Sequence, residues 1–121
     1  MEWTPELSAI RELVSSSAQV SFNSVLLNLY RDGSDSVSWH SDDEEELGAE
    51  PTIASMSLGA TRRFRLRERR TRESLGLDLA DGSLLLMSGA SQRDWEHCLT
   101  KTKRAVGPRI NLTFRVVRVS S

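Results

Sequence analysis

The chain has 121 residues, a formal net charge of −1, 38% hydrophobic residues and 27% charged residues. These values favour one soluble globular domain and argue against a disordered chain. No apolar run approaches the roughly 20 residues of a membrane span, the first residues lack the pattern of a signal peptide, and the single cysteine, Cys98, excludes an internal disulfide. We therefore expect no membrane partner and a cytoplasmic location, or a nuclear one in a eukaryote.

The first predicted element is a helix. Thr4 is a suitable N-cap and Pro5 suits the first helical position. The three serines at residues 15–17 predict a break after it. One apolar face at helical spacing is formed by Leu7, Ile10, Leu13 and Val14.

Beyond the helix, the apolar pattern changes to the period of two that is typical of strands. Several short strands with little helix predict a β-sandwich or barrel in a single domain. The expected strands cover residues 22–30, 52–60, 62–69, 75–80, 83–87 and 109–119, with a turn at Asp81 and Gly82.

Charge is segregated along the chain. Residues 42–46 are all acidic, whereas residues 62–72 are densely basic. Segregated charge can steer a polyanion such as nucleic acid to one face of a neutral protein. The alternative is a solvated strand edge on which arginine prevents aggregation.

A candidate metal site lies in the segment SVSWHSDDEEE, where His40 precedes Asp42 by two residues. In an extended segment both side chains project to the same side and can reach one ion. His97, far along the sequence, would complete the set of two histidines and one carboxylate that non-haem Fe(II) oxygenases use, which leaves positions open for substrate and O₂. The alternative is an ordinary polar loop and an unrelated histidine.

Two of the predicted strands carry polar side chains on one face. Asn28 and Tyr30 share a face of an otherwise apolar strand, and such residues need partners if they point inward. An arginine-lined cavity would suit a small dicarboxylate, because the planar guanidinium matches a carboxylate. The alternative is an outer strand with its polar face in water. In the last strand, the residues on one face are Arg109, Asn111, Thr113 and Arg115.

Together these segments resemble the AlkB family of Fe(II)- and 2-oxoglutarate-dependent dioxygenases, nearest the branch that repairs alkylated nucleic acids. The matching pieces are FNSVLLNLYRDGSDSVSWHSDDE, PTIASMSLGATRRF, DGSLLLM, PRINLTFR and the isolated His97. The resemblance implies a mainly β fold, a double-stranded β-helix (jelly roll) with one N-terminal helix, in a single dioxygenase domain over residues 1–121. It also implies that the family's N-terminal nucleotide-recognition lid is missing, because the match begins only at WTPEL.

The resemblance also implies the role of each polar residue. Asp43 would face the damaged base, Leu26 would lie close to the oxidised carbon, and Arg115 would act with Asp43 in catalysis. The implied Fe(II) ligands are His40, Asp42 and His97. The implied 2-oxoglutarate contacts are Arg109 and Tyr30 at the distal carboxylate, with Asn28, Asn111 and Arg115 at or beside the metal-proximal end.

The activity implied by this resemblance is oxidative demethylation of 1-methyladenine and 3-methylcytosine in DNA or RNA, preferentially single-stranded. It would consume O₂ and release formaldehyde, succinate and CO₂. The arginines of residues 62–72 would contact phosphates. Two alternatives stay open, namely a truncated, non-catalytic module that binds metal or 2-oxoglutarate, and an oxygenase that acts on protein or a small molecule. The sequence predicts no oligomeric state.

Overall fold

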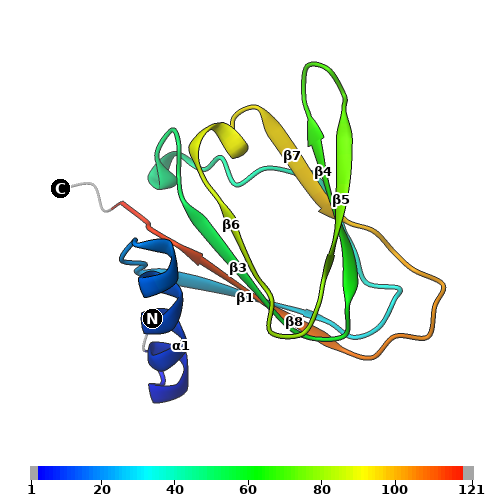
Figure 1. Ribbon diagram of the computed structural model, residues 1–121, viewed down its shortest axis with the longest axis horizontal. Coiled ribbons are helices and arrows are strands. Elements are labelled where there is room, and N and C mark those ends of the chain that lie inside the picture. The colour runs from blue at the N-terminus through cyan, green and yellow to red at the C-terminus, as the bar shows by residue number, and fades with distance from the viewer. Residues whose placement is uncertain (1–2, 119–121) are drawn as a thin grey trace.

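A computed structural model describes residues 3–118 of the chain, which form eight strands, one α-helix and two short 3₁₀ helices (Figure 1). The predicted mainly β class with one N-terminal helix is confirmed. The elements are α1 (Pro5–Ala18), β1 (Ser24–Tyr30), β2 (Val37–His40), η1 (Glu45–Leu47), β3 (Ile53–Gly59), β4 (Arg62–Glu68), β5 (Ser74–Leu79), β6 (Leu84–Met87), η2 (Gly89–Ser91), β7 (Trp95–Leu99) and β8 (Arg109–Arg115).

The strands form two antiparallel sheets of four, with the orders β1-β8-β3-β6 and β2-β7-β4-β5. Most consecutive strands lie in opposite sheets, so the chain passes repeatedly from one sheet to the other. This arrangement is the predicted double-stranded β-helix, in which segments distant in sequence become neighbours. In particular, β2 pairs with β7, and β1 pairs with β8.

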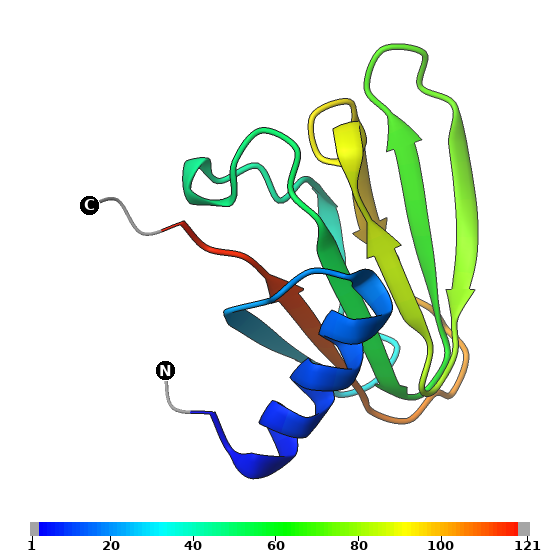
Figure 2. The same ribbon diagram turned by 60° about the vertical axis from the view of Figure 1, so that its left-hand side comes forward.

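Two apolar clusters hold these layers together. One fills the space between the sheets and contains Ile53, Phe64 and Leu99. The other joins α1 to the outer face of the β1-β8-β3-β6 sheet (Figure 2). This cluster contains Val14 of α1 and Phe114 of β8. The helix therefore covers the outer face of the β1-β8-β3-β6 sheet, whereas the site lies on the inner side of this sheet.

The break expected at residues 15–17 is wrong, because α1 continues through them to Ala18. Serine lowers helix propensity only slightly, and the packing of Val14 and Ala18 on the sheet stabilises the last turn. The helix ends at Ala18, and the left-handed backbone of the next residue, Gln19, lets the Val20 N–H donate to the Ser15 carbonyl (3.1 Å). In the described part of the chain, no helix has the length and apolar character needed to cross a bilayer.

The last strand is shorter than predicted. β8 ends at Arg115 rather than at residue 119, and Val119 lies outside the described residues. Beyond the strand, hydrogen bonds to the Asn23 side chain take the place of backbone pairing. Its Oδ1 accepts from the Val117 N–H (2.8 Å), and its Nδ2 donates to the Val117 carbonyl (2.9 Å).

Arg62 opens the basic run, but its side chain is only 2% exposed. Its guanidinium donates to the carbonyls of Asp32 (3.1 Å), Asp35 (2.8 Å) and Thr100 (2.8 Å). These carbonyls belong to the β1–β2 turn and to the segment after β7. Arg62 therefore ties together the loops at one end of the sandwich and is not available to bind phosphate.

We expect Arg62→Met to lower the free energy of unfolding by about 3 kcal/mol, because three carbonyls lose a charged donor. Arg63→Met is the matched control, since Arg63 is exposed and, among residues 3–118, its ion pair is with exposed Asp78 alone. It should cost no more than about 0.5 kcal/mol. Urea unfolding of both variants measures the difference. Equal losses would show that Arg62 does not hold the loops.

Candidate metal centre and cosubstrate cavity

The residues of the predicted triad come together at the end of β2. His40 is the last residue of β2, and it lies directly opposite His97 of β7 in the ladder. The two imidazole centroids are 4.3 Å apart. Asp42 follows two residues after His40, and one ligand atom from each of the three residues lies within 4.8 Å of the others. The predicted convergence of these three side chains is confirmed.

The hydrogen bonds of the triad leave nitrogen and oxygen atoms free to bind a metal ion. His40 Nδ1 lies 2.8 Å from the Ser38 carbonyl, so Nδ1–H donates and the Nε2 lone pair is available for a metal. His97 Nε2 lies 3.7 Å from Asp42 Oδ2. Two imidazole nitrogens and one carboxylate oxygen make a donor set that fits Fe(II) and similar divalent ions.

Burial shifts the pKa values of two of these groups, His97 and Asp42. It lowers the pKa of His97 to about 4, with a further contribution from nearby His40. Burial also raises the pKa of the Asp42 carboxyl, although the charge of His40 opposes this change. A neutral His97 can donate its lone pair, and a desolvated Asp42 carboxylate gains a counter-charge when a cation binds.

Beside the triad, a cavity of about 90 Å³ lies between the two sheets. Its polar lining comes mainly from β1 and β8, two strands of one sheet. The lining includes the triad itself, so a ligand in the cavity would lie against the metal. The predicted residues that line it are Leu26, Asn28, Tyr30, His40, Asp42, His97, Arg109, Asn111 and Thr113.

Arg109 provides the cationic end of this cavity. It is 2% exposed, and its Nη2 donates to Ser57 Oγ (2.9 Å) and to Asn111 Oδ1 (3.3 Å). Its Nε is buried and has no partner within the described residues. The guanidinium carbon lies 5.0 Å from the Tyr30 ring centroid. Burial raises the pKa of the Tyr30 hydroxyl, so it stays protonated beside Arg109. A buried guanidinium with a free N–H and a nearby hydroxyl fits a carboxylate group such as those of 2-oxoglutarate.

Sequence reasoning missed two serines that order this cavity. Ser55 Oγ donates to Asn111 Oδ1 (2.7 Å), and Ser57 holds Arg109. Both are buried on β3 and lie opposite Thr113 and Asn111 in the ladder. Their spacing of two positions in an otherwise apolar strand would have indicated that both serines face the same side as the cavity.

Asp43 and Arg115 lie outside the cavity. Asp43 is exposed on a neighbouring groove of about 380 Å³, which Asp42 also lines. Arg115, at the end of β8, pairs with Glu44 (3.5 Å). Its Nε is buried without a partner in the described part of the chain. Neither residue therefore lines the cavity itself, although Asp43 shares its groove with Asp42.

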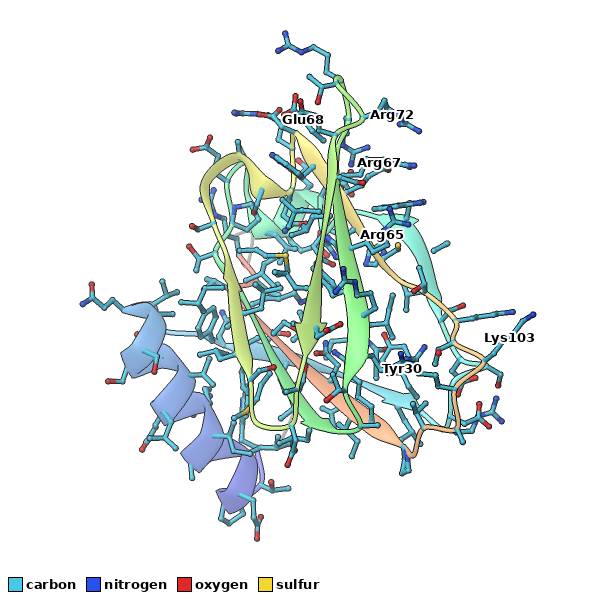
Figure 3. The ribbon with its side chains drawn as sticks, turned by 45° about the vertical axis from the view of Figure 1, so that its right-hand side comes forward. Tyr30, Arg65, Arg67, Glu68, Arg72 and Lys103 are labelled. Atoms are coloured by element: carbon cyan, nitrogen blue, oxygen red, sulfur yellow. The ribbon has the colours of Figure 1, made fainter. Side chains whose placement is uncertain are left out.

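The basic run forms part of the outer face of the β2-β7-β4-β5 sheet. Figure 3 shows Arg65 and Arg67 one after the other along β4, with Arg72 beyond them in the β4–β5 turn. Arg67 pairs with Glu96 and lies 4.0 Å from the Trp39 ring centroid. Arg72 also approaches Glu96 (3.7 Å). Glu96 alone cannot neutralise both arginines, so this face keeps positive charge. The face is therefore compatible with both sequence interpretations, a surface that attracts nucleic acid and a solvated strand edge.

The fold and the donor set define a class, the non-haem iron oxygenases built on a jelly roll. The profile of the 2OG-Fe(II) oxygenase superfamily matches residues 1–115, and the chain belongs to this superfamily. Its resemblance to AlkB proteins is confirmed by two human relatives. The chain is 44% identical to alpha-ketoglutarate-dependent dioxygenase alkB homolog 3 over 124 residues, and 42% identical to DNA oxidative demethylase ALKBH2 over 123 residues.

Each match covers 95% of this chain, but only 43% and 47% of those relatives. The chain thus spans less than half the length of the two human relatives. Among solved structures, OsALKBH1 superposes with a TM-score of 0.71 at 22% identity, covering 93% of this chain and 65% of that one. This similarity supports the jelly-roll fold.

The lowered pKa of His97 predicts a pH-dependent stability of the metal-free protein. Between pH 4 and pH 6.5 the unfolded chain binds a proton at this imidazole and the folded chain does not. Stability contributed by His97 is therefore lost as pH falls through this window, with a slope of up to about 1.4 kcal/mol per pH unit. Urea unfolding should show that His97→Gln removes this slope, whereas His40→Gln keeps most of it, because burial is the larger cause of the lowered pKa of His97. An unchanged slope in His97→Gln would contradict the assignment.

Proposed function

We propose that this chain is the catalytic core of an Fe(II)- and 2-oxoglutarate-dependent dioxygenase that demethylates alkylated bases in DNA or RNA. The observation that carries the proposal is the convergence of His40, Asp42 and His97 beside a cavity that ends at Arg109. The similar proteins point the same way, since one is named a DNA oxidative demethylase and another an alpha-ketoglutarate-dependent dioxygenase.

In this proposal, His40, Asp42 and His97 hold Fe(II). Arg109 and Tyr30 hold the distal carboxylate of 2-oxoglutarate, and Arg115 stabilises the metal-proximal end from the edge of the site. Asn28 and Asn111 order the cavity between them. When bound, Fe(II) with 2-oxoglutarate and O₂ supplies the oxidising chemistry and yields succinate and CO₂. Hydroxylation of an N-methyl group gives an unstable hemiaminal, which releases formaldehyde and leaves the repaired base.

The preferred substrates in this proposal are 1-methyladenine and 3-methylcytosine, preferentially in single strands. These bases are cationic, and the groove beside the metal carries the exposed carboxylate of Asp43. A carboxylate there favours a cationic base over its neutral parent. Base pairing is already lost at such lesions, which lowers the cost of extrusion. The outer arginines Arg65 and Arg72 would then bind phosphates, with affinity that falls as salt rises.

The direct test is turnover. Protein purified without oxygen is mixed with Fe(II), 2-oxoglutarate, ascorbate and a methylated single-stranded oligonucleotide, and air is then admitted. We expect succinate and formaldehyde in equal amounts from the parent, and neither from His40→Ala, because two remaining ligands cannot hold the metal in place. Mass spectrometry of the oligonucleotide measures the lost methyl group, and Ser38→Ala controls for the neighbouring substitution.

The other outcomes distinguish the alternatives. Succinate without loss of the methyl group would indicate an oxygenase for a different substrate, such as a protein or a small molecule. No succinate, from protein shown to bind Fe(II) and 2-oxoglutarate, would indicate a non-catalytic module. Either result would reject nucleic-acid demethylation by this chain.

Arg109 provides a second test, on cosubstrate binding alone. We expect Arg109→Met to weaken 2-oxoglutarate binding by roughly 10- to 100-fold, the loss expected for a charge-assisted pair, while Mn(II) binding changes little. Calorimetric titration of Mn(II)-loaded protein in the absence of O₂ measures both. Arg104→Met, at an exposed position after β7, is the matched control. Parent-like affinity for 2-oxoglutarate would place the dicarboxylate elsewhere.

A further inference from the structure

Asp42 lies beyond the backbone ladder that orders the other two residues of the triad. The β2–β7 ladder ends at the pair of His40 and His97. The two residues that follow β2 are instead bonded through side chains. Ser41 Oγ donates to the Trp95 carbonyl (2.7 Å), and the Asp42 N–H donates to Oε1 of Gln92 (2.8 Å). The side chains of Ser41 and Gln92 thus continue the pairing of the two segments past the end of the strand.

Gln92 is placed and buried in a way that suits this task. It is 2% exposed and is among the largest fully buried side chains of the described residues. It directly follows η2, five positions before His97 in the chain. Its Nε2 lies 3.6 Å from Met87 Sδ and 3.4 Å from Ser91 Oγ. These contacts fix the amide group with its oxygen toward Asp42.

We propose that Gln92 is a positioning residue for the metal centre, which holds the backbone of Asp42 so that its carboxylate meets His97 and His40 around one ion. The inference rests on the proposed metal binding by the triad. The Asp42 carboxylate contacts His97 at 3.7 Å, so the loop before β7 would fix both of these ligands, His97 through the strand and Asp42 through Gln92. Groups that orient metal ligands in this way typically change metal affinity 10- to 100-fold when removed.

A purely structural role would have a different signature. If Gln92 only fastened the loop after η2 to the rest of the fold, its loss would lower stability without a specific effect on metal binding. A positioning role predicts a larger loss of metal affinity than the loss of folding stability can explain. The reason is that Asp42, once it is no longer held by Gln92, must be ordered when the ion binds.

The test compares Gln92→Met with the parent by Co(II) titration of metal-free protein without O₂. Methionine has a similar length but provides no strong acceptor for the Asp42 N–H. We expect the Co(II) dissociation constant to rise roughly 10- to 100-fold and the visible Co(II) absorption bands to change. Asn23→Leu is the matched control, since Asn23 Oδ1 accepts from a backbone N–H at the same 2.8 Å outside the triad. It should leave Co(II) affinity within about twofold of the parent.

A second measurement, on the parent itself, does not depend on any variant folding. Hydrogen exchange of the metal-free protein should show the Asp42 amide protected about tenfold or more relative to the Asp43 amide. Equal exchange of these amides, or parent-like Co(II) affinity in Gln92→Met, would overturn the role of Gln92. Failure of the parent to bind Co(II) would instead reject the metal site, which is a different result.

Discussion

The pairing of β2 with β7 places His40 opposite His97, and the metal centre depends on this contact between two short strands. The ladder is irregular between its pairs at Val37 and His40, and it ends before Asp42. The backbone pair of His40 with His97 therefore positions the two imidazoles, whereas side-chain hydrogen bonds position the carboxylate. This division makes the loop before β7 as important for the site as the strands, because it carries the acceptor for the Asp42 N–H.

The site contains charged and polar groups that the protein alone does not satisfy. Four buried side-chain atoms lack a hydrogen-bond partner within the described residues, and three of them belong to His97, Arg109 and Arg115. Such groups are costly in a folded protein, because each has lost water without gaining a partner. A divalent cation would balance the negative charge of Asp42, and an anion beside it would balance the positive charge of Arg109. The same arrangement that costs stability therefore favours joint binding of a metal and a dicarboxylate.

Much of this architecture could be predicted from the sequence. Period-two alternation located most strands, and the motifs around His40 and Arg109 indicated the triad and the cationic cavity. The serine run at residues 15–17 misled because local propensity ignores packing, and Val14 and Ala18 decide where α1 ends. The prediction that Arg62 belongs to a basic surface was wrong, because alternation along β4 does not show which of its side chains bond to buried carbonyls. Gln92 could not be found, because its partner lies 50 positions away and the contact depends on loop geometry.

Consecutive residues of β7 face opposite sides of its sheet. Glu96 holds arginines on the outer face, and His97 faces inward toward Asp42. Since side chains alternate along a strand, a single-residue deletion between η2 and His97 would exchange these two orientations. It would turn a carboxylate toward the cavity and an imidazole toward the arginines. The segment between η2 and β7 must therefore keep its number of residues for His97 to face Asp42.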